Sequence, residues 1–521
     1  MSNFEIMKDL PIGVQTFKKM RENNYVYVDK TEFVYELARK EGNNFFSRPR
    51  RFGKSLLANT FKELFLGSEQ LFQGLWIHDK WDWSKTYPVI HLSFDAMSYE
   101  GLGLDKAISY ELKYWAEYYQ VTFSTDDYKL QFKELLTKIH EKAGKIVLLI
   151  DEYDKPIIDY LEKGELPQAQ KNQKIMKGFY SVLKSSESLL RFFFVTGVSK
   201  FSKVSLFSDL NHIDDLTLDK RCTTIVGYTQ QELEFYFEEH LQQVMHSLEL
   251  SREELLEDMR VWYNGFSWDG KNKLYNPFGI LNFLQKEAFR SFWFVSGMPF
   301  FLYKVMKDRL VFDVENTAIN GAVLEKYDIE NLDLIPLLFQ TGYLTVKSID
   351  YRTDDMVLDY PNKEVRESLY GFMIDSIAKN EQRSDAGITN KDLVKAFQAA
   401  DLERIKELIN ALLAGLLSEA YDKESEGLFH GLIHFVFQLL GMYIKSEVHS
   451  SKGRADSVVE TATHVFIFEF KFNKTAAAAM TQIKKKKYAD KYRADNKIII
   501  GIGVNFKSTH KEIAGWKTEI L

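Results

Sequence analysis

Four short apolar runs in the first 200 residues constrain the fold more than any other feature of the sequence. The clearest is residues 146–150, five consecutive apolar residues that end in Asp151 and Glu152. A run of this length is typical of a strand buried on both faces of a parallel sheet. Shorter or mixed runs end near Ser47, at Phe94 and at Thr196. Since open α/β sheets bind ligands at the carboxyl ends of their strands, the sequence predicts an α/β domain with a ligand site there.

A phosphate-binding loop is predicted between the first of these strands and an amphipathic helix that begins near Lys54. Gly53, Lys54 and Ser55 match the end of the pattern G-x-x-x-x-G-K-[ST]. In that design, backbone N–H groups and the helix N-terminus hold phosphates, the lysine reaches the β and γ phosphates, and the serine hydroxyl ligates Mg²⁺. The first glycine of the pattern falls on Arg48, so the match is degenerate and needs a second signal.

The acidic end of the apolar run at 146–150 supplies that second signal. Asp151 is predicted to hold Mg²⁺ through water, and Glu152 to polarise the water that attacks the nucleotide. Thr196, at the end of another strand, is placed to sense the γ-phosphate. The alternative for an isolated Asp-Glu pair at a strand end is a helix cap. Together with Lys54 and Ser55, the pair predicts ATP with Mg²⁺ as the cofactor.

A second acidic pattern lies near the C-terminus, where Glu469 and Lys471 end an apolar strand and Asp456 lies 13 positions before Glu469. Residues i and i+2 of a strand share a face, so Glu469 and Lys471 converge while Phe470 turns into the core. The gap after Asp456 lets a strand run out, turn and return. Two carboxylates can hold Mg²⁺ or Mn²⁺, and the lysine can orient water or stabilise developing charge. The pattern predicts a metal-dependent nuclease, with structural ion pairs as the alternative.

Two further residues join this candidate set. Glu447 is predicted to be an additional metal-side carboxylate, and Gln482 begins a lysine-rich helix that faces nucleic acid. The alternatives are a surface charge for Glu447 and a solvated helix residue for Gln482. Net charge is −6, but residues 471–521 carry 12 Lys and Arg against 4 Asp and Glu. This basic C-terminal domain predicts DNA as the nucleic-acid partner, although a solvated lysine-rich helix has the same composition.

Composition excludes several other classes of protein. A single cysteine, Cys222, rules out an internal disulfide and a cysteine-based zinc cluster. The first residues have no basic region followed by an apolar core, so no secretory signal is expected. Residues 427–444 approach membrane-spanning length, but His430, His434 and Gln438 draw a polar stripe along them. We therefore expect a helix buried against the nuclease sheet, no membrane partner and a cytoplasmic location.

Several longer motifs resemble a known family. "FFSRPRRFGKSLL", "LLIDEYDKP", "TGVSKFSKVSLFSDLN", "GYTQQEL", "WYNGFSW" and "YNPFGILNFL" resemble the predicted AAA-ATPase-like family of gut bacteria. Members commonly end in a PD-(D/E)XK nuclease-superfamily domain, which the "GRADSVVET…FIFEFKFNKT" region resembles. An arginine in place of the first loop glycine is usual in this family. The resemblance implies nucleotide contacts from residues of the loop and of the segment after Thr196, namely Arg50, Arg51, Phe52, Gly53 and Lys200. Tyr27 and its neighbours lie either near the nucleotide base or in a surface turn.

These observations predict an α/β multidomain fold. Residues 1–225 form an AAA-like P-loop ATPase domain with a parallel sheet, and residues 226–325 a helical lid. Residues 326–420 form a winged-helix-like and helical connector, whose apolar recognition helix favours scaffolding over DNA binding. Residues 421–521 form an α/β PD-(D/E)XK nuclease-like domain.

The leading functional hypothesis is an ATPase coupled to a Mg²⁺-dependent deoxyribonuclease, in which nucleotide state controls access to the nuclease site. The alternative is a regulatory ATPase switch whose nuclease-like domain binds nucleic acid or a protein without cleavage. A toxin or defence module would share the chemistry and differ in target. The sequence leaves open whether the chain forms a homo-oligomer.

Overall fold

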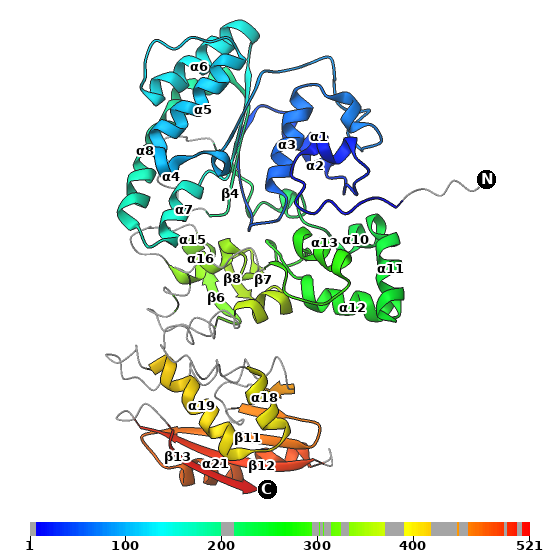
Figure 1. The fold of residues 1–521 in the computed structure, drawn as a ribbon, viewed down its shortest axis with the longest axis vertical. Coiled ribbons are helices and arrows are strands. Elements are labelled where there is room, and N and C mark those ends of the chain that lie inside the picture. Colours follow the sequence, from blue (N-terminus) through cyan, green and yellow to red (C-terminus); the bar gives the residue numbers. More distant parts are fainter. Residues whose placement is uncertain are drawn as a thin grey trace, which may run out of the picture. The chain divides into compact units, whose positions relative to one another are not determined.

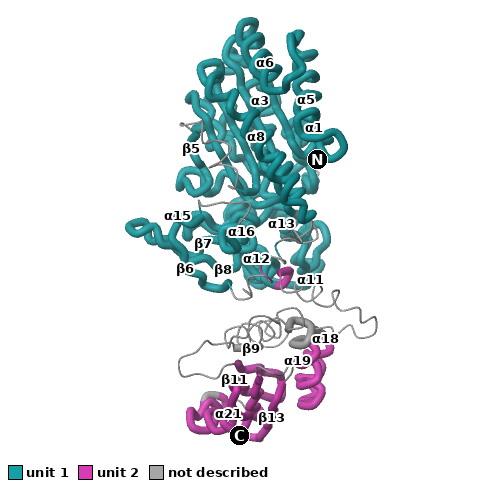
Figure 2. Tube along the Cα trace, turned by 90° about the vertical axis from the view of Figure 1, so that its left-hand side faces the viewer, with its two compact units in different colours: residues 1–305, 314–366 teal, residues 306–313, 367–521 magenta. Residues whose placement is uncertain are grey.

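The computed structural model (Figure 1) describes most of the chain. The described residues are 7–199, 213–293, 302, 306, 314–324, 333–369, 390–417, 445–447, 457–493, 497–507 and 513–521. The chain forms two compact units, residues 1–305 with 314–366 and residues 306–313 with 367–521 (Figure 2).

A five-stranded parallel sheet forms the centre of the first unit, in the order β2-β3-β4-β1-β5. Its strands are β1 (Gly42–Ser47), β2 (Val89–Ser93), β3 (Ile146–Asp151), β4 (Leu190–Gly197) and β5 (Ile213–Asp215). Every residue of β3 is buried, as its uninterrupted apolar run predicts. Because the strands are parallel, the polar residues that follow β1, β3 and β4 lie at one edge of the sheet.

Helices cover both faces of this sheet (Figure 1). On one side lie α1 (Phe17–Glu22), α2 (Thr31–Ala38) and α3 (Lys54–Phe65). On the other lie α4 (Tyr99–Leu102), α5 (Leu104–Tyr118), α6 (Tyr128–Ala143), α7 (Lys155–Glu162) and α8 (Leu166–Ser186). Phe61 of α3 packs against Phe192 and Phe194 of β4, each pair of ring centroids being 4.9 Å apart. This aromatic contact fixes α3, and with it the phosphate loop, on the sheet.

The helical region that follows contains α10 (Gln230–Tyr236), α11 (Glu238–Leu248), α12 (Arg252–Tyr263) and α13 (Pro277–Lys286). The sequence predicts one helix across "GYTQQELEFYFEEHL", but the structure has two, separated at Phe237. The Phe237 side chain is buried in the core of this region together with Tyr263 and Tyr275. Val26 and Val28 from the N-terminal segment join the same core, so this region packs directly on the N-terminal segment of the parallel-sheet domain.

A small antiparallel sheet completes the first unit, in the order β6-β8-β7. Its elements are β6 (Thr317–Asn320), α15 (Gly321–Leu324), α16 (Leu334–Thr341), β7 (Thr345–Asp350) and β8 (Asp355–Asp359). A helix (α16), a strand (β7), a polar turn and a second strand (β8) therefore follow one another, which is the element order behind the winged-helix-like prediction for this segment. Leu334, Leu337 and Leu338 of α16 are buried, which suits a packing helix better than one that reads DNA.

A buried carboxyl group links this sheet region to the end of the helical region. Glu364 is 1% exposed and accepts hydrogen bonds from the backbone N–H groups of Phe292 (2.5 Å) and Trp293 (2.7 Å). Burial raises the pKa of Glu364 to about 7, although the two N–H donors act against this shift.

The raised pKa makes the stability of the first unit depend on pH. A carboxyl whose pKa is higher in the folded than in the unfolded state stabilises the fold at low pH. That contribution is lost as pH rises towards 7. Glu364→Gln keeps the accepting oxygen and cannot ionise. We therefore expect the unfolding free energy of the variant, relative to that of the wild type, to rise by up to about 3 kcal/mol between pH 5 and pH 8. Thermal unfolding at both pH values measures this gain, and an equal difference at both would contradict the assignment.

The second unit is built on a mixed sheet in the order β13-β12-β11-β10-β9. Its strands are β9 (Lys445–Glu447), β10 (Ser457–Glu460), β11 (His464–Phe472), β12 (Ile498–Phe506) and β13 (Ile513–Ile520). Its helices are α18 (Asn390–Gln398), α19 (Leu402–Leu417) and α21 (Ala476–Lys485). Only β11 and β12 pair in parallel, and α21 connects them. The predicted hairpin around residues 461–463 is present as β10 and β11.

The two faces of β11 have different partners. Val465 and Ile467 pack with Met480 and Ile483 of α21. Phe466 and Phe468 face Phe397 of α18, with ring centroids 5.1 Å and 6.2 Å away. No helix in the described part of the chain is both long and apolar enough to cross a membrane. Residues 427–444, predicted to form a buried helix, lie outside the described residues.

Candidate nucleotide and nuclease sites

The phosphate loop connects β1 to α3 and ends in a left-handed glycine. Gly53 has φ +93°, a conformation that glycine adopts without strain, and α3 begins at Lys54. The Lys54 side chain is 4% exposed, and its Nζ donates hydrogen bonds to the carbonyl oxygens of Arg48 (3.0 Å) and Pro49 (3.1 Å). Burial lowers the pKa of Lys54, while the carboxylates of Glu152 and Asp151 act in the opposite direction. The lysine ammonium is therefore held within the loop.

Arg48, which occupies the position of the first glycine in the general loop pattern, is a structural residue. Its guanidinium donates to the carbonyl oxygens of Ser47 and Thr217, both at 2.8 Å, and of Cys222 at 3.1 Å. It also stacks over the ring of Trp268, 4.0 Å from the centroid. Burial lowers the pKa of Arg48 to about 9, which leaves the guanidinium charged at neutral pH. Arg48 thus ties the start of the loop to the segment after β5.

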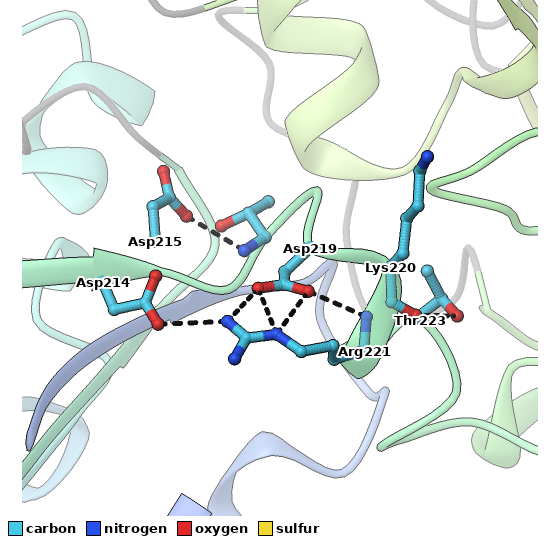
Figure 3. Close-up of polar contacts among 7 residues, drawn as sticks. Asp214, Asp215, Asp219, Lys220, Arg221 and Thr223 are labelled. Carbon is cyan, nitrogen blue, oxygen red and sulfur yellow. Dashed lines mark hydrogen bonds and ion pairs between the residues drawn. The ribbon is translucent and has the colours of Figure 1, made fainter. Parts of the chain in front are cut away.

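That segment is itself held by local ion pairs and turns (Figure 3). Asp215 accepts a hydrogen bond from the Thr217 backbone N–H at 2.9 Å. Asp219 accepts one from the Arg221 backbone N–H at 2.8 Å and also pairs with the Arg221 guanidinium, which reaches Asp214 as well. These contacts hold in place the segment whose carbonyl oxygens, at Thr217 and Cys222, accept hydrogen bonds from Arg48.

Arg48→Ala should strongly destabilise the first unit. It removes the hydrogen-bond donor of three carbonyl groups and leaves an empty space under the loop. We expect a loss of about 3 kcal/mol or more in unfolding free energy. Arg39→Ala is the matched control, since among the described residues the ion-pair partner of Arg39 is the exposed Glu36, and it should change stability by less than about 1 kcal/mol. Denaturant unfolding of the full chain compares the two. Equal stability of Arg48→Ala and the wild type would contradict this role.

The acidic residues at the end of β3, Asp151 and Glu152, lie beside the end of β4. The Asp151 side chain is 4% exposed and accepts a hydrogen bond from the Thr196 hydroxyl. Glu152 has φ +51°, which is uncommon for a residue other than glycine and recurs at functional sites. Burial raises the pKa of Glu152, as do the nearby carboxylates, whereas Lys54 lowers it. The structure therefore brings Lys54, Asp151, Glu152 and Thr196 together at one sheet edge.

Asp154, in the same motif, fastens this acidic turn to the end of β4. It is 1% exposed and accepts hydrogen bonds from the backbone N–H of Val198 (3.1 Å) and from the N–H and hydroxyl of Ser199 (both 2.6 Å). Tyr153 adds a hydrogen bond from its hydroxyl to the Ser199 carbonyl at 2.8 Å. These hydrogen bonds connect the acidic turn to Val198 and Ser199, which directly precede Lys200 in the sequence.

A cavity of about 320 Å³ opens beside the loop, within the usual size range of small-molecule sites. Its wall comes from the phosphate loop and α3, from Asp95 after β2, Glu152 after β3 and Lys155 at the start of α7, and from the N-terminal segment around Tyr27, the turn 225–228 and the start of α13. Tyr27 and Val28 are buried, which excludes the surface turn considered for this segment. Elements distant in sequence thus enclose one site.

The loop residues predicted to contact the nucleotide line this cavity in different ways. Arg50, Arg51, Phe52, Gly53 and Ser55 all contribute to its wall. The Arg51 guanidinium lies over the ring of Phe278 from α13, 4.9 Å from the centroid. The Arg50 carbonyl accepts hydrogen bonds from the side chains of Trp293 (3.3 Å) and Asn276 (3.4 Å). The helical region is therefore bonded directly to the phosphate loop.

In the second unit, Glu469 and Lys471 lie together on β11. Glu469 is 1% exposed, and its Oε1 lies 2.6 Å from the Lys471 Nζ. Glu469 pairs in register with Gly503 of β12. A Cβ at Gly503 would lie 2.4 Å from the Ala476 carbonyl oxygen, so the start of α21 passes closely over the strands at this point. Phe470 is buried on the opposite face beside Phe468 and Phe506.

The remaining candidate residues are placed less completely. Asp456 lies outside the described residues, directly before Ser457 of β10, which pairs with Phe468. Glu447 is part of β9 and pairs in register with Val458, but its side chain is not described. Gln482 is half-buried on α21, which begins at Ala476 and not at Gln482 as predicted, and Lys200 lies outside the described residues. Within the described part of the chain, no three His, Cys, Asp or Glu side chains form a metal-binding group.

The lysines after Gln482 form an exposed basic cluster, residues 484–487. Lys484 pairs with Glu519 of β13, whereas Lys485, Lys486 and Lys487 are exposed at the end of α21. This leaves a concentrated positive charge on the surface next to the edge of the nuclease-like sheet.

Comparison with known proteins agrees with this geometry. A family model described as "Predicted AAA-ATPase" matches residues 11–207, and one described as "PD-(D/E)XK nuclease superfamily" matches residues 424–516. A protein of Azotobacter chroococcum mcd 1, described as "Uncharacterized protein in vnfD 5'region", is 36% identical over 537 residues, 99% of each chain. The chain belongs to the predicted AAA-ATPase family. It ends in a PD-(D/E)XK nuclease-superfamily domain, so both the resemblance and the α/β multidomain fold class predicted from the sequence are confirmed.

Sequence reasoning missed several residues of the candidate nucleotide site. Asp95 follows β2, and the rule that identified Asp151 at the end of β3 would also have identified it. Asp154 and Lys155 belong to the same "DEYDKP" motif as Asp151 and Glu152. The buried role of Arg48 had no local signal, because its partners Thr217 and Cys222 are distant in sequence.

Proposed function

We propose that the chain binds and hydrolyses ATP with Mg²⁺ in the cavity beside α3, and that its C-terminal domain hydrolyses DNA phosphodiester bonds under the control of nucleotide state. The observation that carries the proposal is the convergence of Lys54, Asp151, Glu152 and Thr196 at one sheet edge. This edge is where parallel α/β sheets place ligand-binding groups.

The residues present fit ATP and Mg²⁺. Ser55 at the start of α3 and Asp151 at the end of β3 supply the oxygen ligands that Mg²⁺ prefers. Lys54 and the N-terminus of α3 neutralise phosphate charge, with Arg50, Arg51, Phe52, Gly53 and Lys200 as further contacts. Glu152 orients the attacking water and accepts its proton, and Thr196 connects the terminal phosphate to Asp151. The bound cation would supply charge stabilisation on the phosphate oxygens.

The nuclease site rests on Glu469 and Lys471. A carboxylate buried on a strand is stable only when it is compensated, and Lys471 provides that compensation. We assign Asp456, Glu469 and Glu447 to a Mg²⁺ or Mn²⁺ site, and Lys471 to the attacking water or the developing charge on the phosphate. Gln482 and the basic cluster at 484–487 hold the DNA backbone.

The four sequence-based domains, with boundaries at 225, 325 and 420, belong to this proposal. So do a cytoplasmic location and assembly into a homo-oligomer, in which Lys200 would reach the γ-phosphate of a neighbouring copy. The alternative, a nucleotide-controlled switch that binds nucleic acid or protein without cutting, shares every feature of the ATP site.

One incubation series separates the two functions. Purified full-length protein is mixed with linear, circular and single-stranded DNA and with RNA, in Mg²⁺ or Mn²⁺, with and without ATP. The proposal predicts metal-dependent DNA cleavage that changes with ATP. Hydrolysis of ATP without cleavage of any substrate would favour the switch and reject the nuclease.

A further inference from the structure

Lys155 is a lysine of the cavity wall that lies next to Glu152. It begins α7, three positions after Glu152, and lines the cavity together with Lys54 and Glu152. Its side chain is 26% exposed, so it is neither buried in the core nor free in solvent. No catalytic role described above uses it.

The Lys155 ammonium is held between two carboxylates with different environments. Asp159, one turn along α7, is 14% exposed and lies 3.1 Å from the Lys155 Nζ through Oδ2. The same Asp159 oxygen accepts a hydrogen bond from the buried Tyr99 hydroxyl at 2.6 Å. Asp95 lies farther away, at 3.5 Å, and its side chain is 62% exposed. Asp159 is therefore the fixed anchor, and Asp95 is a weak, solvated partner.

These contacts keep Lys155 charged. Burial acts to lower the pKa of Lys155, but the carboxylates of Asp159, Asp95 and Glu152 outweigh burial and raise it above the ordinary lysine value. A nucleoside triphosphate in this cavity would face the negative charges of Asp95 and Glu152. A cation that can turn from Asp95 towards the phosphate would reduce that repulsion.

We propose that Lys155 contacts the terminal phosphate of ATP, leaving Asp95 while it stays anchored to Asp159, and so makes the site favour ATP over ADP. This inference rests on the proposed ATP site. It adds a catalytic-site lysine to the loop lysine, Lys54, whose ammonium donates to the loop carbonyls. ADP lacks the phosphate that Lys155 reaches, so the contact distinguishes the two nucleotides.

The alternative is an ordinary ion pair between positions i and i+4 of a helix, which has no effect on nucleotide binding. The opposite end of the same helix offers a matched control. Lys163 follows α7 and pairs with Glu100 at 2.8 Å, is 44% exposed, and does not line the cavity. If Lys155 only forms a helix ion pair, its substitution should affect nucleotide binding no more than substitution of Lys163 does.

The test compares the affinities of the full chain for ADP and for the slowly hydrolysed ATP analogue AMP-PNP, both with Mg²⁺. Lys155→Ala should weaken AMP-PNP binding by roughly 10- to 100-fold, the range of a hydrogen bond to a charged group, and ADP binding by less than about threefold. Lys155→Arg should restore most of the preference for AMP-PNP, and Lys163→Ala should leave both affinities unchanged. Lys155→Gln serves as a second variant if the alanine variant does not fold.

An AMP-PNP to ADP ratio in folded Lys155→Ala or Lys155→Gln equal to that of the wild type overturns the inference while leaving the ATP site intact. A wild-type protein that binds neither nucleotide overturns the proposed ATP site and this inference with it. The two failures are therefore distinguishable within one set of titrations.

Discussion

Glu152→Gln is expected to bind ATP with near wild-type affinity and to hydrolyse it at least about 100 times more slowly. The amide keeps the size of the side chain but cannot accept a proton from the attacking water, and general bases contribute roughly 10²- to 10⁴-fold. Phosphate release under saturating ATP measures the loss, and equilibrium titration measures binding. Glu165→Gln, at an exposed glutamate before α8, is the control and should hydrolyse ATP normally.

The pH profile of hydrolysis provides an independent check of Glu152. Burial and the neighbouring carboxylates raise its pKa. Because only the ionised form accepts a proton, the rate should fall on the acidic side with a midpoint above the ordinary glutamate value of about 4.3. If Glu152→Gln turned ATP over at the wild-type rate, another residue would have to be the base.

The second large effect is expected in the C-terminal domain. Glu469→Ala removes a candidate metal ligand, and Lys471→Ala removes the ammonium group beside that ligand. Each change should lower DNA cleavage by orders of magnitude. The two variants should differ in metal binding. Glu469→Ala should lose the thermal stabilisation that Mn²⁺ gives, whereas Lys471→Ala should keep it or increase it. The reason is that the metal then compensates the charge of the buried Glu469 carboxylate in place of Lys471.

Lys497→Ala is the matched control for Lys471→Ala. Lys497 pairs with the buried Glu460 at 3.3 Å near the opposite end of the same sheet. The Lys497→Ala change should lower the unfolding free energy of the domain without lowering DNA cleavage per folded molecule. ATP hydrolysis in the absence of DNA should survive all three changes. Equal cleavage by Lys471→Ala and Lys497→Ala would show that Lys471 is a structural ion-pair partner.

The sequence predicted those parts of the molecule that follow from local pattern. The apolar run at 146–150 became the fully buried β3, and Gly53-Lys54 became the junction of loop and α3. The alternation around Phe470 predicted that Glu469 and Lys471 share a face, because strand periodicity depends only on the backbone.

What the sequence could not predict depends on contacts between distant segments. In sequence, Arg48 is only a departure from the first glycine of the loop pattern, but its guanidinium is buried and donates to the carbonyl groups of residues 217 and 222. The break at Phe237 arises because its ring enters a core shared with the N-terminal segment. The wall of the cavity likewise includes residues from before β1 and from α13, which no local pattern joins.

The most direct test of the central claim is titration of the full chain and of Lys54→Ala with ATP in the presence of Mg²⁺. Circular dichroism serves to confirm that both proteins are folded. The account predicts that the wild type binds one ATP per chain and that Lys54→Ala shows no measurable binding, because its ammonium is the main charge facing the β and γ phosphates. Equal affinity of the two folded proteins, or no binding by the wild type, would contradict the assignment of this cavity as an ATP site.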